Sequence, residues 1–407
     1  MPLASFFSDR RLFYRIASYA LFFLVAAAAF HGYRNKGGLE GEGASAVALH
    51  QGFTLATALD ETADRPFVFR TLLPSTANAL NALLPQPLVD RLYRARNSDG
   101  VLLHEKFSPS IVERDRTYFA RYWILFFLEL LAYFLTTIVC YHFCCMYGFS
   151  RPVSALSTCI FMLLLPYFLE PWGYFYDCPE ILFFLLSAMA ALRGRWAWLM
   201  PLAALATLNK ESYLPFISVL YPFLRQRLTR EKSGLALALV AIPSILVNIY
   251  VHWIFRYNPG GNAQVHFIDQ LKSVRDILLL SHPRATYGIL QPPTENILAL
   301  LFLLWTIALG WKLLAPTLRQ HFWIALCINL PLFAVLGYPG EIRTLSMLYI
   351  SLVVLLASHI EHWSRLSAEA PAREEARVPA GAPDYASPPA LSSMPSLGSA
   401  GFSSPRQ

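Results

Sequence analysis

The sequence predicts an all-α polytopic membrane protein with about ten transmembrane helices and a long first extracytoplasmic loop that bears amphipathic surface helices. The 407 residues are 56% hydrophobic and only 14% charged, with a mean hydropathy of +0.43. A typical soluble domain has roughly 25% charged residues. Aromatic residues make up 14% of the chain, as expected for belts of Trp and Tyr at two membrane interfaces. Apolar runs recur along most of the chain, and this pattern excludes a soluble globular protein.

Apolar runs close to the length of about 20 residues that crosses a bilayer define the predicted helices. In chain order they are residues 12–30, 123–143, 153–169, 181–192, 196–208, 213–224, 235–255, 297–313, 322–336 and 345–360. The three runs between 181 and 224 are short. They either extend through their polar flanks or are half-helices that line a cavity.

Basic residues predict the orientation, because cytoplasmic loops carry an excess of Lys and Arg. Basic residues precede the first span and then occupy alternate connections: Arg10, Arg11, Arg15, Arg151, Arg193, Arg195, Arg225, Arg227, Arg230, Lys232, Lys312 and Arg319. The connection around Tyr174 carries Glu170, Asp177 and Glu180 and no Lys or Arg. Both termini are therefore predicted to be cytoplasmic.

The start of the chain also fits a secretory signal, because an Arg-rich beginning and an apolar run lead to the small residues Ala26 to Ala29. The many later spans favour an uncleaved anchor. In either case the segment that follows lies outside the cytoplasm.

Residues 1–363 form the predicted transmembrane domain, with external loops at 31–121 and 256–295. Long loops are uncommon and usually functional. In the first loop, apolar residues recur with helical spacing at Leu72, Leu73, Ala77, Leu80, Leu83, Leu84, Leu88 and Leu92. This pattern predicts one or two amphipathic helices, broken at Pro85 and Pro87, that lie on the membrane or on the protein's own external face. Residues 364–407 are rich in Pro, Ala, Ser and Gly, which predicts a disordered cytoplasmic tail.

Charge and cysteine content argue against nucleic acid and against a metal or redox centre. The net charge of +7 comes from Lys and Arg scattered at helix ends. Five of the six cysteines lie inside apolar runs, where Cys behaves as a small hydrophobe. The histidines of the external loops, His50, His266 and His282, lack metal-ligand spacing. We predict no cofactor, and a divalent metal is not indicated.

Acidic residues concentrate in the first external loop at Asp60, Glu61 and Asp64, and Arg65 and Arg70 follow. A carboxylate at a membrane surface can serve as general base on a hydroxyl group. An Arg nearby can hold a phosphate in a bidentate fork. Taken alone, the pattern is more typical of a solvated acidic turn, because surface charge pairs are common and weak.

Three further charged motifs end apolar runs on the same predicted side, and ionisable groups at membrane depth indicate a functional site by default. Asp177 and Glu180 are three residues apart and share one helical face. They either cap the helix that Pro179 begins and complement its dipole, or bind a sugar hydroxyl or a metal. Lys210 and Glu211 are adjacent, which is poor geometry for a helical ion pair. This spacing favours a Lys210 that faces a cavity and meets an anion.

The last of these three motifs, Glu341 and Arg343, begins the last predicted span. It fits an interfacial ion pair that anchors this helix. The alternative is an Arg that contacts a lipid phosphate.

With these motifs in place, the chain resembles the GT-C superfamily of polytopic glycosyltransferases, which use polyprenyl-phosphate sugars outside the cytoplasm. The resemblance covers about residues 10–360 and rests on the layout of a cytoplasmic N-terminus, a first span and a long first external loop with an acidic site. The chain is also similar to a group of bacterial membrane proteins with four short motifs in this order: Pro-Phe-x-x-Arg-x-Leu-x-Pro, Tyr-Asp-x-Pro-Glu, Asn-(Arg/Lys)-Glu-(Thr/Ser) and Glu-x-Arg. They match residues 66–74, 176–180, 209–212 and 341–343 here.

The resemblance implies an inverting displacement at the anomeric carbon of a sugar, in the bacterial inner membrane. It implies Asp60 as the base, with Glu61 as the second choice, although this pair departs from the paired Asp-Asp of some members. The cations implied to bind the donor phosphate are Arg65, Arg70, Lys210 and Arg343. The residues implied to bind the sugar or the acceptor are Asp177, Glu180, Glu211 and Glu341. The implied partners are a polyprenyl-phosphate sugar, a glycan, lipid or protein acceptor, and membrane lipids.

Three other readings remain open. A flippase or transporter of a lipid-linked sugar would use the same charges, although the sequence shows no internal repeat. A polysaccharide polymerase or ligase of another class would carry its large loop late in the chain. In a non-catalytic membrane subunit the charges would form ion pairs only, and apolar replacement of both partners would be tolerated.

Overall fold

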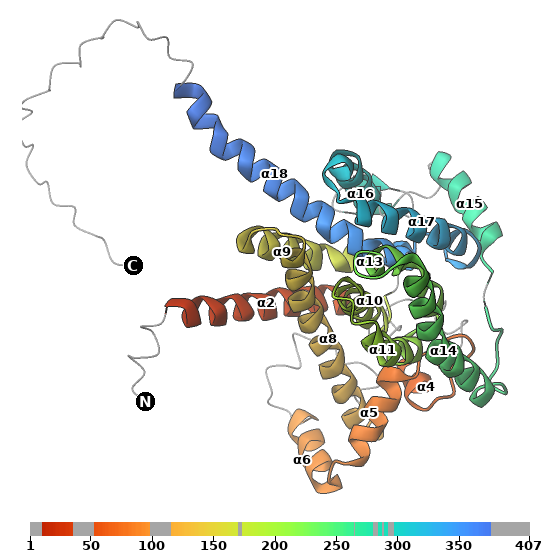
Figure 1. Cartoon of the computed structure of the whole chain (residues 1–407). Coiled ribbons are helices and arrows are strands. Elements are labelled where there is room, and N and C mark those ends of the chain that lie inside the picture. Colours follow the sequence, from red (N-terminus) through yellow and green to blue (C-terminus); the bar gives the residue numbers. More distant parts are fainter. Residues whose placement is uncertain are drawn as a thin grey trace, which may run out of the picture. The chain divides into compact units, whose positions relative to one another are not determined.

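The computed structural model describes residues 10–35, 53–97, 115–169, 173–263, 265–279, 284–286, 289–291 and 297–375 (Figure 1). These residues are almost entirely helical. The helices are α2 (Arg10–Asn35), α4 (Leu55–Leu59), η1 (Phe67–Phe69), α5 (Leu72–Ala82), α6 (Gln86–Asn97), α8 (Phe119–Met146), α9 (Arg151–Phe168), α10 (Asp177–Leu192), α11 (Trp196–Asn209), α12 (Tyr213–Val219), α13 (Tyr221–Leu224), α14 (Arg230–Ile254), α15 (Phe267–Leu278), α16 (Ile297–Gly310), η2 (Trp311–Leu313), α17 (Pro316–Leu336), η3 (Ile342–Leu348) and α18 (Tyr349–Glu375). One short antiparallel hairpin pairs β1 (Arg284–Thr286) with β2 (Ile289–Gln291).

The helices make the chain an integral membrane protein. In the described part, six segments are long and apolar enough to cross a membrane: Tyr14–Arg34, Phe119–Met146, Arg151–Phe168, Arg230–Ile254, Pro316–Leu336 and Ile342–Ser367. The other predicted spans are also helical, but α10 and α11 have only 16 and 14 residues, and Tyr213–Leu224 and Ala299–Leu313 are shorter apolar helices. The prediction of a helical membrane protein is confirmed, whereas the count of about ten spans and the orientation stay predictions.

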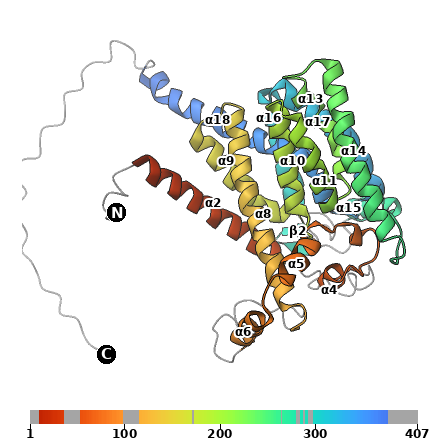
Figure 2. The same ribbon diagram turned by 60° about the horizontal axis from the view of Figure 1, so that its bottom comes forward.

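Helix α10 lies at the centre of the packing. It packs along α8 and α11, and α11 in turn packs along α14, while α2 packs on α8 and α9 (Figure 2). Thirteen of the sixteen residues of α10 are buried, so this helix has no exposed face. Its first turn carries Asp177 and Glu180, and both carboxylates are therefore buried inside the protein rather than exposed at a surface.

The first predicted external loop forms the two predicted helices, α5 and α6, and they are separated at Leu83–Pro85 as expected from the prolines. Helix α5 packs on α8 through a face that includes Leu73 and Ala77. Four apolar side chains of α5, α6 and the turn between them remain exposed, namely Leu80, Leu83, Leu88 and Leu92, whereas Val89 of α6 is buried. The predicted contact with the protein is thus present, and the predicted contact with the membrane stays a prediction.

The first and second predicted external loops are joined at Arg65 and Gly260. The backbone N–H of Arg65 donates to Pro259 O at 2.8 Å, and its guanidinium donates to Gly260 O at 2.6 Å. Gly260 has a φ of +85°, and a Cβ atom at this position would lie 2.6 Å from Arg65 O. A side chain at this position would therefore be strained by backbone conformation and by contact.

Gly260→Ala is expected to lower the free energy of unfolding by about 1–3 kcal/mol, because the left-handed backbone and the close carbonyl both oppose a Cβ atom. Thermal unfolding in detergent measures the change. Gly234→Ala is the matched control, because a Cβ there meets nothing within 4 Å inside α14, and it is expected to be neutral or stabilising by up to about 1 kcal/mol. Equal effects of the two substitutions would contradict the conclusion that the contact between Gly260 and Arg65 opposes a side chain at Gly260.

Helix α18 passes from one compact unit, Met1–His362, into a second, Trp363–Gln407. The predicted tail falls mostly on residues 376–407, which lie outside the described residues. The predicted domain boundary between 363 and 364 therefore stays a prediction.

Candidate functional site

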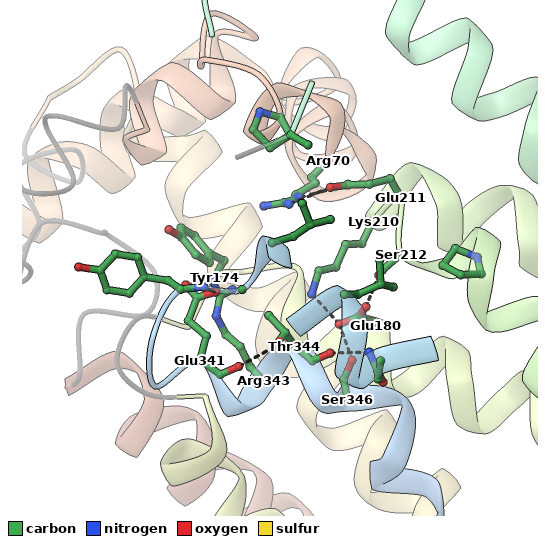
Figure 3. A pocket seen from close by; sticks show the side chains of 18 of the residues that line it. Arg70, Tyr174, Glu180, Lys210, Glu211, Ser212, Glu341, Arg343, Thr344 and Ser346 are labelled. Carbon is green, nitrogen blue, oxygen red and sulfur yellow. Dashed lines mark hydrogen bonds and ion pairs between the residues drawn. The ribbon is translucent and has the colours of Figure 1, made fainter. Parts of the chain in front are cut away.

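A cavity of about 320 Å³ lies where the predicted motifs meet. Figure 3 shows that its charged side chains come from four separate parts of the chain. They are Arg70 from the first predicted external loop, Glu180 from α10, Lys210 and Glu211 from the break after α11, and Glu341 and Arg343 from the start of η3. Tyr174, Ser212, Asn329, Thr344 and Ser346 add polar groups to the lining. The volume lies at the lower end of the usual range for ligand pockets, roughly 300–1,000 Å³.

Lys210 bridges the two carboxylates of α10. Its ammonium Nζ lies 2.8 Å from Glu180 Oε2 and 3.2 Å from Asp177 Oδ1. This position follows from the end of α11 at Asn209, since Lys210 takes an extended conformation with φ −163° and ψ 132°. The side-chain amide of Asn209 donates to Tyr176 O at 2.8 Å and so fixes the break against the start of α10. Lys210 faces the cavity as predicted, and in this structure its anions are two carboxylates of its own chain.

Asp177 also forms an ion pair with Arg343. The guanidinium NH1 lies 3.0 Å from Asp177 Oδ2, and NH2 lies 2.7 Å from Glu341 Oε1. The same Asp177 oxygen accepts the backbone N–H of Tyr174 at 2.8 Å. One carboxylate therefore holds two cations and a backbone N–H, which links α10, the break after α11 and η3 in one network.

Glu180 is satisfied by three donors. Besides Lys210, the hydroxyl of Ser346 donates to its Oε2 at 3.2 Å, and the hydroxyl of Ser212 donates to its Oε1. The side chain is only 3% exposed. Fixed donors of this kind hold a buried carboxylate in one orientation.

Arg70 and Glu211 form a two-pronged ion pair. NH2 lies 2.9 Å from Glu211 Oε1, and Nε lies 3.3 Å from Oε2. The guanidinium also donates to the hydroxyl of Tyr176 and lies 4.3 Å from the centre of its ring. Burial alone raises the pKa of Glu211, but the charge and the hydrogen bonds of Arg70 outweigh burial and hold that pKa below its usual range. Glu211 is therefore an anion throughout the neutral pH range.

The network is close to balanced in charge. Three cations, Arg70, Lys210 and Arg343, meet four carboxylates, Asp177, Glu180, Glu211 and Glu341. Within the described residues, two buried groups of the lining have no hydrogen-bond partner, namely Arg343 Nε and Asn329 Oδ1. Such a donor and acceptor suit a ligand with hydroxyl groups, which both accept and donate hydrogen bonds.

Aromatic rings form one side of the network. The rings of Tyr174 and Tyr176 stack with their centres 5.1 Å apart and their planes 9° from parallel. Arg343 lies 4.4 Å from the centre of the Tyr174 ring. Burial raises the pKa of both phenols, so both rings are neutral. As for a metal, the described residues contain no group of three or more His, Cys, Asp or Glu side chains that could hold one.

The structure places Asp60, Glu61 and Arg65 outside the lining of this cavity. The Asp60 carboxylate lies 2.8 Å from Arg121 NH1 and accepts the hydroxyl of Tyr118. This hydrogen bond raises the pKa of Tyr118. Asp60 and Glu61 are thus not gathered with the phosphate-binding candidates, and Arg65 is used to join the two loops. Their predicted roles stay predictions.

The other seven predicted site residues are brought together in one network. Several members were not predicted, among them Tyr174, Ser346 and Asn329. Asn329 had a signal in the sequence, because it is a lone amide within the apolar run 322–336 and polar groups there are expensive. Ser346 had none, because a serine in an apolar helix commonly bonds to its own backbone.

Comparison of the chain with protein-family models, curated proteins and solved structures finds no match. The charged cavity is therefore the feature of this chain that points to a function.

Proposed function

We propose that this chain is a membrane glycosyltransferase that moves a sugar from a polyprenyl-phosphate donor to an acceptor hydroxyl outside the cytoplasm. One observation carries the proposal: six charged side chains from four distant motifs line one cavity at the end of a buried helix, and Asp177 pairs with two of them. The proposal includes about ten spans, cytoplasmic termini and a cavity on the external side. It agrees with the GT-C resemblance.

The cations of the cavity supply what the leaving group needs. A polyprenyl phosphate gains negative charge as the bond from the anomeric carbon to the phosphate oxygen breaks, and fixed cations stabilise that charge. Arg70 is the first candidate, because its fork matches two phosphate oxygens. Each cation is already paired, so the phosphate binds by exchanging with a carboxylate such as Glu211.

Glu211 is also the best placed base among the carboxylates that line the cavity. Its side chain is 33% exposed, against 3% for Glu180 and 11% for Glu341. In the proposed step, the acceptor oxygen bonds to the anomeric carbon, the bond to the phosphate oxygen breaks, and the acceptor proton passes to Glu211. The polyprenyl phosphate leaves, and the configuration at the anomeric carbon is inverted.

Transfer of labelled sugar from polyprenyl-phosphate donors by the purified protein in vesicles tests the proposal. Arg70→Lys keeps the charge but loses the fork, and we expect it to reduce kcat/KM by about 10- to 100-fold, the value of one charge-assisted bond of roughly 1.5–3 kcal/mol. Arg116→Lys is the matched control, because this exposed Arg pairs with Asp90 away from the cavity. Equal rates for the two variants would contradict a role of Arg70 in transfer.

A second candidate function, a non-catalytic membrane subunit, is favoured by the pairing of every cation in the network. In that case the pairs only hold the helices in place, and replacement of both partners by apolar residues is tolerated. Arg70→Met combined with Glu211→Met distinguishes the two. A folded double variant that still supports the protein's role in cells would favour the subunit, and a folded variant without that role would favour the enzyme.

A further inference from the structure

A second recess lies beside the first cavity, between α5 and the C-terminal end of α14. Its volume is about 530 Å³. The apolar side chains that line it include Leu72, Leu80, Val251 and Ile254, and Glu61 and Ser75 are among its polar lining groups. This volume is also within the range of ligand sites, roughly 300–1,000 Å³. We refer to this recess as the α5–α14 groove.

The groove differs in charge from the first cavity. Among the described residues that line it, none is Lys or Arg, and Glu61 is the one carboxylate. The first cavity holds Arg70, Lys210 and Arg343. A phosphate would meet a like charge in the groove, whereas a hydroxyl group could donate to the carboxylate of Glu61 or to the hydroxyl oxygen of Ser75.

Glu61 is held in an unusual conformation. Its φ is +58°, and it is the one residue other than glycine with a positive φ in the described part of the chain. Asn258 donates to its backbone oxygen at 3.0 Å, and the hydroxyl of Ser75 donates to its carboxylate at 3.2 Å. Strained backbone of this kind clusters at ligand sites, where the surroundings over-determine it.

One wall of the groove is continuous with an exposed apolar surface on a candidate membrane-spanning helix. Tyr250 and Ile254 are 58% and 39% exposed on α14, a helix long and apolar enough to span the membrane. Leu80 on the opposite wall is 41% exposed. An apolar chain in the bilayer can therefore enter the groove sideways without crossing water.

The groove and the first cavity share a wall. Arg70 lines the cavity, and the next two residues, Thr71 and Leu72, line the groove. Likewise Lys210 lines the cavity and Leu208 lines the groove. The two sites are thus separated by two short stretches of chain.

We propose that the α5–α14 groove binds the apolar chain of an uncharged, hydroxyl-bearing membrane lipid, with the hydroxyl end at Glu61 and Ser75. The occupant is identified by the exposed apolar wall on α14, the other apolar side chains of the lining and, among the described lining residues, one carboxylate with no Lys or Arg. This binding does not depend on the proposed glycosyl transfer. If transfer does take place, the lipid is placed beside the site of reaction.

Photolabelling tests the proposal. The protein in phosphatidylcholine vesicles is exposed to a photoreactive long-chain alcohol, or to the phosphate monoester of the same chain, and the labelled residues are mapped by mass spectrometry. We expect the alcohol to label residues 72–82 and 250–255 at least about tenfold more than the phosphate. Glu61→Lys is expected to reverse that preference.

Two variants of α5 locate the label. Ala79 lines the groove, so Ala79→Trp is expected to remove labelling of these residues. Leu83→Trp is the matched control, because Leu83 is 78% exposed at the end of the same helix and does not line the groove. Equal labelling by alcohol and phosphate in the wild type would overturn the choice of ligand, and labelling that survives Ala79→Trp would overturn the site. Both readouts are independent of turnover, so a protein inactive in transfer still gives either result.

Discussion

Lys210→Met is expected to lower the free energy of unfolding by about 3–5 kcal/mol, the usual cost of removing one partner of a buried ion pair. The side chains of Asp177 and Glu180 are only 2% and 3% exposed. Without Lys210 their two charges face each other across the start of α10, and Arg343 compensates only Asp177. Methionine keeps most of the apolar stem, so the loss reports the charge. Unfolding in detergent, followed by heat or denaturant, measures it.

Lys272→Met is the control, because Lys272 is 61% exposed and pairs with an exposed Asp269. It is expected to change stability by less than about 0.5 kcal/mol. Glu180→Gln in the Lys210→Met background is expected to recover part of the loss, because the amide keeps its contacts with the serine hydroxyls and removes the unpaired charge. A single variant as stable as the wild type would show that the network is solvated and unimportant for folding.

Glu211→Gln is expected to reduce kcat for sugar transfer by about 10²–10⁴-fold, the usual contribution of a positioned general base. Glutamine has the same shape and can still accept a hydrogen bond from Arg70, so the folded state and donor binding are expected to persist. Asp60→Asn is expected to keep most of the rate, because Asp60 lies outside the cavity lining and is held by Arg121. Initial rates at saturating donor, with donor binding measured separately, give both values.

The opposite result would be equally informative. Loss of turnover in Asp60→Asn or Glu61→Gln, with retained turnover in Glu211→Gln, would return the base to the first external loop, as the GT-C resemblance implies. Loss in both Asp60→Asn and Glu211→Gln, with donor binding intact, would indicate that the loop moves onto the cavity when substrate binds.

The pH profile of kcat/KM gives a second check on Glu211. Because Arg70 holds the pKa of Glu211 below its usual range, the base is ionised above the ordinary glutamate pKa of about 4.3. The rate is therefore expected to be flat with respect to this group from about pH 5 upward and to fall only below about pH 4. The stability from the Arg70–Glu211 pair has the same sign: it is present above the unfolded pKa and is lost as pH falls through the lower, folded pKa.

The sequence by itself determined the helical membrane class and the helical segments. A run of apolar residues can be assigned as a helix without knowing which segments pack against it, because the bilayer requires every spanning segment to satisfy its own backbone hydrogen bonds. Local chemistry also placed the break between α5 and α6 at Pro85. The adjacency of Lys210 and Glu211 disfavoured a pair between them, and in the structure the two side chains have separate partners.

Only the tertiary structure decided which charges meet. Arg70 and Glu211 are 141 residues apart, and Asp177 and Arg343 are 166 apart. Hydrophobic periodicity predicts which face of a helix is buried, but the partner of a buried charge depends on how distant helices pack and where a helix such as α11 ends. The acidic residues of the first loop illustrate this limit, because their sequence pattern fits a base equally well whether the loop folds onto the cavity or, as for Asp60, onto Arg121 and Tyr118.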